Sequence, residues 1–136
     1  MKLLLDTHVA IWLSEGSKRL APAVRRTIER ATRVDGVTIS SISFWEVGIL
    51  AQKGRVTLPQ RLAPWRTAIL SQPGVDEVPV SSDIAIEAIE LPGSMHGDPA
   101  DRLIVATARI TGARLVTADE RIVTYGRQGH VIVLEA

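Results

Sequence analysis

Leu3-Leu4-Leu5-Asp6-Thr7-His8, at the start of the 136-residue chain, is the stretch that decides the fold class. Residues 2–5 form a short apolar run, which is typical of a strand buried on both faces. An acid follows this run directly, and residues 7–14 continue as a short predicted helix. A buried strand that passes straight into a helix favours an α/β protein with a parallel sheet.

The rest of the chain continues this alternation of strand and helix. Further strands are predicted at residues 37–40, 75–80, 114–117 and 131–134. Apolar positions at helical spacing predict helices around residues 20–31, 43–52, 60–71, 82–91, 99–110 and 119–125. The predicted order is β-α-α-β-α-α-β-α-α-β-α-β. We therefore expect one domain over residues 1–136, built as a three-layer α/β/α sandwich with a central parallel sheet of four to five strands.

Composition narrows the class of protein. Hydrophobic residues make up 46% of the chain, which is enough for a core, and cysteine is absent. The lack of cysteine excludes a disulfide framework and a thiolate metal site, and we expect a cytoplasmic protein. Asp6 and His8 interrupt the first apolar run, so we do not expect a signal peptide. No stretch approaches the ~20 apolar residues that span a bilayer.

Four carboxylates stand where a strand or loop leads into a predicted helix: Asp6, Glu46, Asp101 and Asp119. Asp6 and Asp119 follow predicted strands closely, so both should lie at the carboxyl edge of the sheet, where such folds bind ligands. Two like charges ~5 Å apart repel by roughly 3 kcal/mol at an effective dielectric of 20. Gathered acids must therefore take up protons or bind a hard cation, and oxygen ligands suit Mg²⁺ or Mn²⁺.

Two of these acids, Asp6 and Asp119, also have an ordinary structural explanation as helix caps. Glu46 has one as well, because it lies three residues after Ser43, which is the spacing of a capping box.

The third segment allows the same two interpretations. Asp98-Pro99 is a cap followed by proline at the first helical position, which puts Asp101 in the favourable first turn. Thr117, two residues before Asp119, is either a plain β-branched strand residue or a hydroxyl that orients a carboxylate or a water. Spacing alone leaves caps and metal ligands as alternatives.

The charge distribution points to a polyanion as a possible substrate. Thirteen of the 16 basic residues are arginine, which suits bidentate phosphate contacts. If four of the 15 acids share one pocket, the remaining 11 acids are outnumbered by basic residues elsewhere. A basic surface around an acidic pocket fits a nucleic acid, whereas the plainer interpretation of the same surface is a solvated charged face.

Four local sequences together resemble those of PIN-domain nucleases, in the same order and at similar distances. They are Leu3-Leu4-Leu5-Asp6-Thr7-His8, Ser43-Phe44-Trp45-Glu46-Val47, His96-Gly97-Asp98-Pro99-Ala100-Asp101-Arg102 and Leu115-Val116-Thr117-Ala118-Asp119. The second and third segments favour one subgroup, the VapC toxins of bacterial type II VapBC toxin–antitoxin pairs. One departure is Leu50, where many relatives have a lysine, and Lys53 is the nearest basic residue.

The resemblance implies a function. The chain would be the toxin of such a pair, a Mg²⁺- or Mn²⁺-dependent endoribonuclease that hydrolyses RNA to inhibit translation and growth. Asp6, Glu46, Asp101 and Asp119 would match the catalytic, metal-binding quartet, with Asp98 and Thr117 as accessory residues. Attack by water would leave a 5′-phosphate and a 3′-hydroxyl. A cognate VapB-type antitoxin would hold the toxin inactive, and the toxin would form a homodimer.

Three other interpretations compete with a metal nuclease. Metal-free RNA cleavage would use His8 and His96 as a proton-transfer pair. A phosphoryl-transfer domain is a poor match, because a haloacid-dehalogenase-like phosphatase needs a second Asp at position 8. A PIN-like module that binds RNA or a protein without cutting remains the main alternative. Trp45, beside Glu46, is predicted to pack in the core, so we expect no base-stacking platform.

Overall fold

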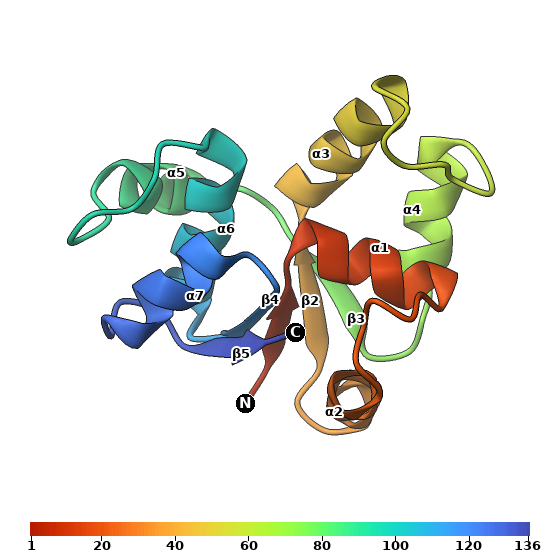
Figure 1. Cartoon of the computed structure of the whole chain (residues 1–136), viewed down its shortest axis with the longest axis horizontal. Helices are drawn as coiled ribbons and strands as arrows, with labels where there is room; N and C mark the ends of the chain where they lie inside the picture. The colour runs from red at the N-terminus through yellow and green to blue at the C-terminus, as the bar shows by residue number, and fades with distance from the viewer.

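The computed structural model describes residues 1–136 as a five-stranded parallel sheet with helices on both faces (Figure 1). The elements are β1 (Leu3–Leu5), α1 (Thr7–Glu15), α2 (Pro22–Arg33), β2 (Val37–Ser40), α3 (Ser41–Gln52), α4 (Leu62–Leu70), β3 (Val75–Val78), α5 (Ser82–Ile89), α6 (Pro99–Thr111), β4 (Arg114–Thr117), α7 (Glu120–Arg127) and β5 (Val133–Glu135). This order and the three-layer arrangement confirm the predicted fold class. None of the helices has the length and apolarity to cross a membrane.

The sheet has the strand order β3-β2-β1-β4-β5, with β1 at its centre. Leu3 pairs with Val37 of β2 on one side and with Arg114 of β4 on the other. The chain first adds strands outward from β1 to β3 and then returns to place β4 on the opposite side of β1. The carboxyl ends of β1 and β4 therefore form the topological switch point, where open α/β sheets bind ligands.

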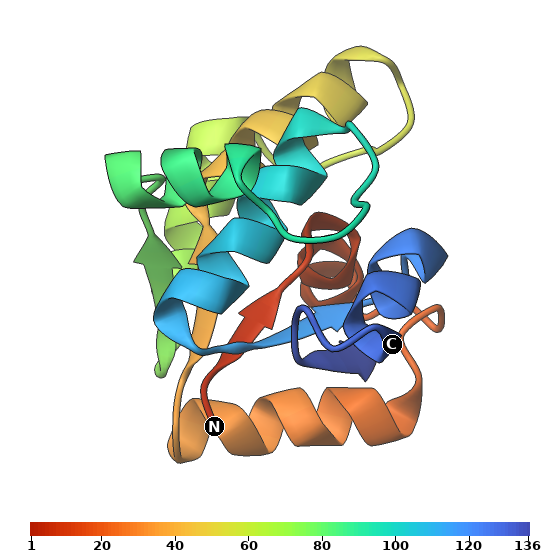
Figure 2. The same ribbon diagram turned by 90° about the vertical axis from the view of Figure 1, so that its left-hand side faces the viewer.

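Alternate side chains of β1 enter two separate cores. Leu3 and Leu5 pack with residues of α1, α2, α3 and α4, whereas Leu4 packs with residues of α6 and α7. All three side chains are almost fully buried, and burial of each contributes roughly 2 kcal/mol. In Figure 2, β1 starts near α2 and runs toward the end of the molecule where α1 and α6 begin. The central strand thus fixes Asp6 at that end.

The helix predicted at residues 20–31 spans Pro22–Arg33, and the last strand, predicted at 131–134, spans Val133–Glu135. Two other helix starts are displaced by two residues, each for an identifiable reason. The helix predicted from Ser43 begins at Ser41, because the Ser40 Oγ accepts the Ile42 N–H at 3.2 Å and caps it. The helix predicted from residue 60 begins at Leu62, which leaves Pro64 at its third position. An earlier start would place Pro64 in the helix interior, where its missing N–H and its ring break the hydrogen-bond ladder.

Candidate active site

Five acids meet around the carboxyl ends of β1 and β4. Asp6 follows β1, Asp119 precedes α7, Asp98 and Asp101 begin α6, and Glu46 projects from α3. Carboxylate oxygens of Glu46, Asp98 and Asp101 lie within 4.8 Å of one another. Asp101 and Asp119 form a second such group with His96. We call these five acids the acidic pocket, and Asp101 is common to both of its groups.

Three acids of the pocket are helix caps as well. The Oδ1 atoms of Asp6, Asp98 and Asp119 accept the backbone N–H groups of Thr7, Asp101 and Arg121, at 2.8, 3.0 and 2.8 Å. The cap interpretation and the pocket interpretation are therefore both correct for these residues. Each cap fixes one carboxylate oxygen and so orients the other, which makes the helix starts the scaffold of the pocket.

Asp6 is the most buried acid, with 6% of its surface exposed. Its Oδ2 accepts a hydrogen bond of 2.6 Å from the Thr117 hydroxyl on the neighbouring strand β4. The Thr117 Oγ1 in turn accepts the Asp119 N–H at 3.0 Å, so one hydroxyl connects two acids. Burial raises the pKa of Asp6, although the hydrogen bonds from Thr117 and Thr7 oppose that rise. Thr117 therefore orients a carboxylate in addition to filling the strand.

Glu46 lies in the second turn of α3, not in its first, so the capping-box interpretation with Ser43 is wrong. Ser40 caps the helix, which leaves the Glu46 carboxylate free to accept a short hydrogen bond from the Thr7 hydroxyl. That hydroxyl is also hydrogen-bonded to Ser43 Oγ at 2.9 Å. Burial raises the pKa of Glu46 against the effect of Thr7. Ser43 is a support for the pocket, a role that its spacing in the sequence did not indicate.

Asp101 experiences the charges of all four other acids of the pocket. Burial, together with the charges of Asp6, Asp98, Glu46 and Asp119, raises its pKa from 3.8 to about 7. Near neutral pH, the pocket therefore holds a carboxyl group that is close to half-protonated, because burial and the acidic neighbours disfavour its charged form. Such a site gains free energy when a divalent cation replaces the proton.

Asp119 differs from the others because it has a cationic partner. Burial alone would raise its pKa, but the hydrogen bonds and charge of Arg121 outweigh burial and lower it. Arg121 Nη2 lies 3.2 Å from Asp119 Oδ2 and 3.7 Å from Asp101 Oδ2. The sequence analysis missed Arg121, and the only available signal was a basic residue two positions after a candidate ligand.

His96 lies against the acids, with its Nε2 3.3 Å from Asp101 Oδ2 and with no hydrogen-bond partner for that atom. Its Nδ1 accepts a long hydrogen bond of 3.4 Å from the Asp98 N–H, which makes Nε2 the protonated nitrogen of the neutral ring. His8 is exposed, and its ring centroid is 6.2 Å from that of Trp12. Each histidine thus has its own neighbour, and nothing in this arrangement favours a His8–His96 proton-transfer pair.

Trp45 does not pack in the core, so that prediction is wrong. The neighbouring Phe44 and Val47 take the buried face of α3, and this leaves 60% of the Trp45 surface exposed. Successive residues of a helix point about 100° apart, so the pocket-facing Glu46 and the exposed Trp45 occupy different faces.

Arg102, another residue that the sequence analysis did not single out, holds the segment that carries Asp98. Its guanidinium donates to the carbonyls of Ala88 and Ile89 at the end of α5, and to those of Met95 and His96 in the following loop. The bonds to Ala88 and Met95 are 2.9 and 3.0 Å long. One side chain of α6 therefore ties together the helix and the loop on which the pocket depends.

We expect Arg102→Met to lower the free energy of unfolding by about 2–4 kcal/mol, because it leaves several partly buried carbonyls without their charged donor. Arg102→Lys keeps the charge but loses the planar, forked guanidinium, so its free energy of unfolding should lie between those of the wild type and Arg102→Met. Urea titrations followed by circular dichroism measure both. Arg114→Met is the matched control, since the Arg114 side chain makes no hydrogen bond or ion pair. If Arg102→Met and Arg114→Met lower the free energy of unfolding equally, the proposed role of Arg102 in tying α5 and the following loop together is wrong.

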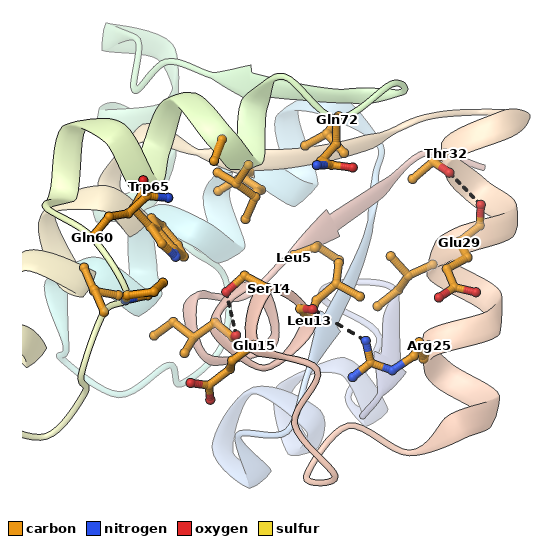
Figure 3. A pocket seen from close by; sticks show the side chains of 18 of the residues that line it. Leu5, Leu13, Ser14, Glu15, Arg25, Glu29, Thr32, Gln60, Trp65 and Gln72 are labelled. Atoms are coloured by element: carbon orange, nitrogen blue, oxygen red, sulfur yellow. Dashed lines mark hydrogen bonds between the residues drawn. The ribbon is translucent and has the colours of Figure 1, made fainter.

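A large, partly apolar cavity lies elsewhere in the molecule. Its volume is about 580 Å³, and it is bordered by α1, α2 and α4 together with the loop that precedes α4. Figure 3 shows Leu5 and Trp65 at its wall, with Glu15, Arg25 and Glu29 at the side of α1 and α2. None of the five acids of the pocket lines it. The general preference of ligands for apolar cavities therefore does not identify the polar site of this protein.

Comparison with known proteins agrees with this geometry. A family model described as PIN domain matches residues 3–128. Ribonuclease VapC22 of Mycobacterium tuberculosis (strain ATCC 25618 / H37Rv) is 40% identical to the chain over 120 residues, which is 88% of each protein.

Solved structures share the fold at low sequence identity. VapBC2 from Rickettsia felis, bound to a DNA fragment from its promoter, has a TM-score of 0.71 at 18% identity and covers 99% of this chain and 98% of that chain. VapBC-1 from nontypeable Haemophilus influenzae has a TM-score of 0.62 at 20% identity, with the same coverage. The family model and the 40% identical relative are the decisive matches. The chain therefore belongs to the PIN domain family and is related within it to the VapC ribonucleases.

Proposed function

We propose that this protein is a metal-dependent endoribonuclease and the toxin of a type II toxin–antitoxin pair, acting as a single PIN domain. The observation that carries the proposal is the acidic pocket, where four neighbouring acids and burial raise the pKa of Asp101 to about 7. The similarity to Ribonuclease VapC22 supports RNA as the substrate. The same similarity supports a role as a toxin of the VapC kind, which would inhibit translation and growth in the cytoplasm.

The donor set of the pocket fits a hard divalent cation. Asp101 would be the central ligand, with Glu46 on one side and Asp119 on the other, because its oxygens belong to both close groups. Asp6 would complete the set from the end of β1, and Asp98 would be accessory. Carboxylate oxygens suit both Mg²⁺ and Mn²⁺. When bound, such a cation lowers the pKa of water and neutralises charge that develops on a phosphate.

The chain's own residues would supply the orientation. Thr117 and Thr7 hold both oxygens of Asp6, and Thr7 also holds Glu46, so these carboxylates are fixed before any ligand arrives. Asp101 accepts no hydrogen bond from a protein donor, and without a cation its raised pKa lets it hold a proton near neutral pH, which a bound cation would replace. Hydrolysis by water at this pocket would leave a 5′-phosphate and a 3′-hydroxyl.

The proposed partner is a VapB-type antitoxin, supported by solved relatives that are themselves toxin–antitoxin complexes. A basic side chain of the antitoxin would enter the acidic pocket, where charge-assisted hydrogen bonds to carboxylates are strong. We also propose a homodimer, which light scattering after size-exclusion chromatography would detect as twice the 14.8 kDa mass.

Cleavage of total bacterial RNA by the purified protein tests the activity. We expect discrete products with 5′-phosphates in Mg²⁺ or Mn²⁺, and no products in EDTA or with Asp6→Asn, whose fold is checked by circular dichroism. Cleavage that survives EDTA would overturn the metal-dependent mechanism. If metal-loaded protein without antitoxin cuts no RNA, the chain is better described as a module that binds RNA or protein without cutting.

A further inference from the structure

Arg121 is a cation built into the acidic pocket. It is the second residue of α7, and its side chain folds back over the start of the helix. Nε lies 3.4 Å from Asp119 Oδ1, and Nη2 lies 3.2 Å from Asp119 Oδ2. The same Nη2 is 3.7 Å from Asp101 Oδ2 on α6. One guanidinium therefore spans two acids that come from different elements.

This placement is not explained by helix stability. A positive charge in the first turn of a helix is disfavoured by the helix dipole, which prefers acids there. No lysine and no other arginine forms an ion pair with an acid of the pocket. Arg121 is thus the one strong base that faces this site, and it faces the two acids that would be shared by a bound cation.

A guanidinium and a divalent cation compete for these oxygens. Oxygens of Asp101 and Asp119 lie within 4.8 Å of each other, close enough to share one ion. An ion there would neutralise the two acids and repel the guanidinium. The Arg121 side chain is 62% exposed, and exposed ion pairs are weakly held, so it can leave at little cost.

A displaced Arg121 remains at the rim of the pocket, because its backbone is fixed two residues after Asp119. Its planar fork matches the non-bridging oxygens of a phosphate, which it can bind with two parallel hydrogen bonds. RNA that reaches the pocket presents such a phosphate beside the acids. The residue can therefore serve the cation-free protein and the substrate complex in turn.

We propose that Arg121 has two successive partners: it neutralises Asp101 and Asp119 in the cation-free protein, and it binds a phosphate of the RNA after a divalent cation displaces it. This inference rests on the proposed function, since that activity supplies both the cation and the substrate. It makes Arg121 a competitor of the metal and a substrate-binding residue at once.

Arg121→Gln tests both roles with readouts that do not depend on cleavage. Calorimetry should find Mn²⁺ bound about three- to fivefold more tightly, because the competing ion pair is gone. Anisotropy of a fluorescently labelled single-stranded RNA of mixed sequence, in Ca²⁺ and with intact RNA verified on a gel, should find binding about tenfold weaker. Arg127→Gln is the matched control, since it removes the same charge from the same helix, where Arg127 pairs with Glu135 at 3.5 Å.

The expected gain in Mn²⁺ affinity and loss of RNA affinity distinguish this inference from a purely structural role. If Arg121 only holds Asp119 in place, Arg121→Gln will weaken Mn²⁺ binding or leave it unchanged, and that result overturns the exchange. If Arg121→Gln and Arg127→Gln lose RNA affinity equally, net charge alone explains the loss, and the proposed phosphate contact of Arg121 is overturned. Wild-type protein that binds neither Mn²⁺ nor RNA would instead remove the proposed function itself.

Discussion

Asp101→Asn should abolish RNA cleavage and at the same time stabilise the cation-free protein at pH 8. Asp101 belongs to both close groups of the pocket, so its loss removes the central ligand of any bound cation. A metal ion contributes several kcal/mol to a hydrolytic transition state, so we expect cleavage to fall by roughly 10³-fold or more. At pH 8 the wild-type Asp101 is ionised among four other acids, whose charges, together with burial, raise its pKa to about 7. The neutral amide of asparagine removes this repulsion, so stability should rise.

Asp83→Asn provides the matched control for this prediction. Asp83 also lies in the first turn of a helix, α5, but is exposed and outside the acidic pocket. Initial rates on RNA and urea unfolding at pH 8 should both stay near wild type for this variant. If Asp101→Asn keeps more than about a tenth of the wild-type rate, a central role of Asp101 in metal binding is wrong. A loss of stability would contradict the electrostatic origin of its raised pKa.

The fold was predictable because its main signals are local. The apolar run of β1 and the helical periodicities identify the elements, and alternation of strands and helices leaves few arrangements other than a covered parallel sheet. In such a sheet the carboxyl ends of the strands share one edge, so an acid directly after β1 and another just after β4 had to meet. That reasoning placed Asp6 and Asp119 correctly without any knowledge of side-chain contacts.

The features that escaped prediction depend on where side chains point. The register of α3 is set by Ser40 as cap, which rules out the capping-box pairing of Ser43 with Glu46 and leaves only the pocket role for that acid. Trp45 seemed a core residue because large aromatics are usually buried, yet Phe44 and Val47 already fill that face. The fold-back of Arg121 and the four carbonyl contacts of Arg102 are tertiary contacts that no sequence spacing encodes.

A carboxylate that caps a helix can also contribute an oxygen to the acidic pocket. A cap binds a backbone N–H with one oxygen and leaves the second oxygen directed by the same geometry. At a helix start, backbone N–H groups also favour an ionised carboxylate. Asp6, Asp98 and Asp119 use this arrangement, so the helix starts that stabilise the fold also place oxygens at the sheet edge. The hydrogen bonds that stabilise these helix starts are therefore the same ones that orient the acids of the pocket.

The cation-free protein should lose stability as the pH rises from 5 to 8, and Mg²⁺ should restore it most strongly at pH 8. The folded-state pKa of Asp101, about 7, exceeds its ordinary value of 3.8. Between these values the folded chain holds a proton that the unfolded chain releases, so increasing pH favours unfolding until it passes about 7. Asp6 and Glu46 shift in the same direction. The Asp101 difference corresponds to at most about 4 kcal/mol, and hydration at the pocket mouth should reduce the loss to about 1–2 kcal/mol.

Asp119 does not mask this trend, because its lowered pKa places its own loss of stability at a more acidic pH. Thermal melts of EDTA-treated protein at pH 5 and pH 8, with and without Mg²⁺, measure the effect as a shift of several degrees. At pH 5 Asp101 already holds a proton, so Mg²⁺ must displace that proton and should stabilise less. Asp101→Asn should flatten the pH dependence and reduce the response to Mg²⁺, whereas Asp83→Asn should retain both.

A cation response that is equal at the two pH values would show that the acids of the pocket are already ionised in the cation-free protein, and the electrostatic basis for a metal site at Asp101 would then fail.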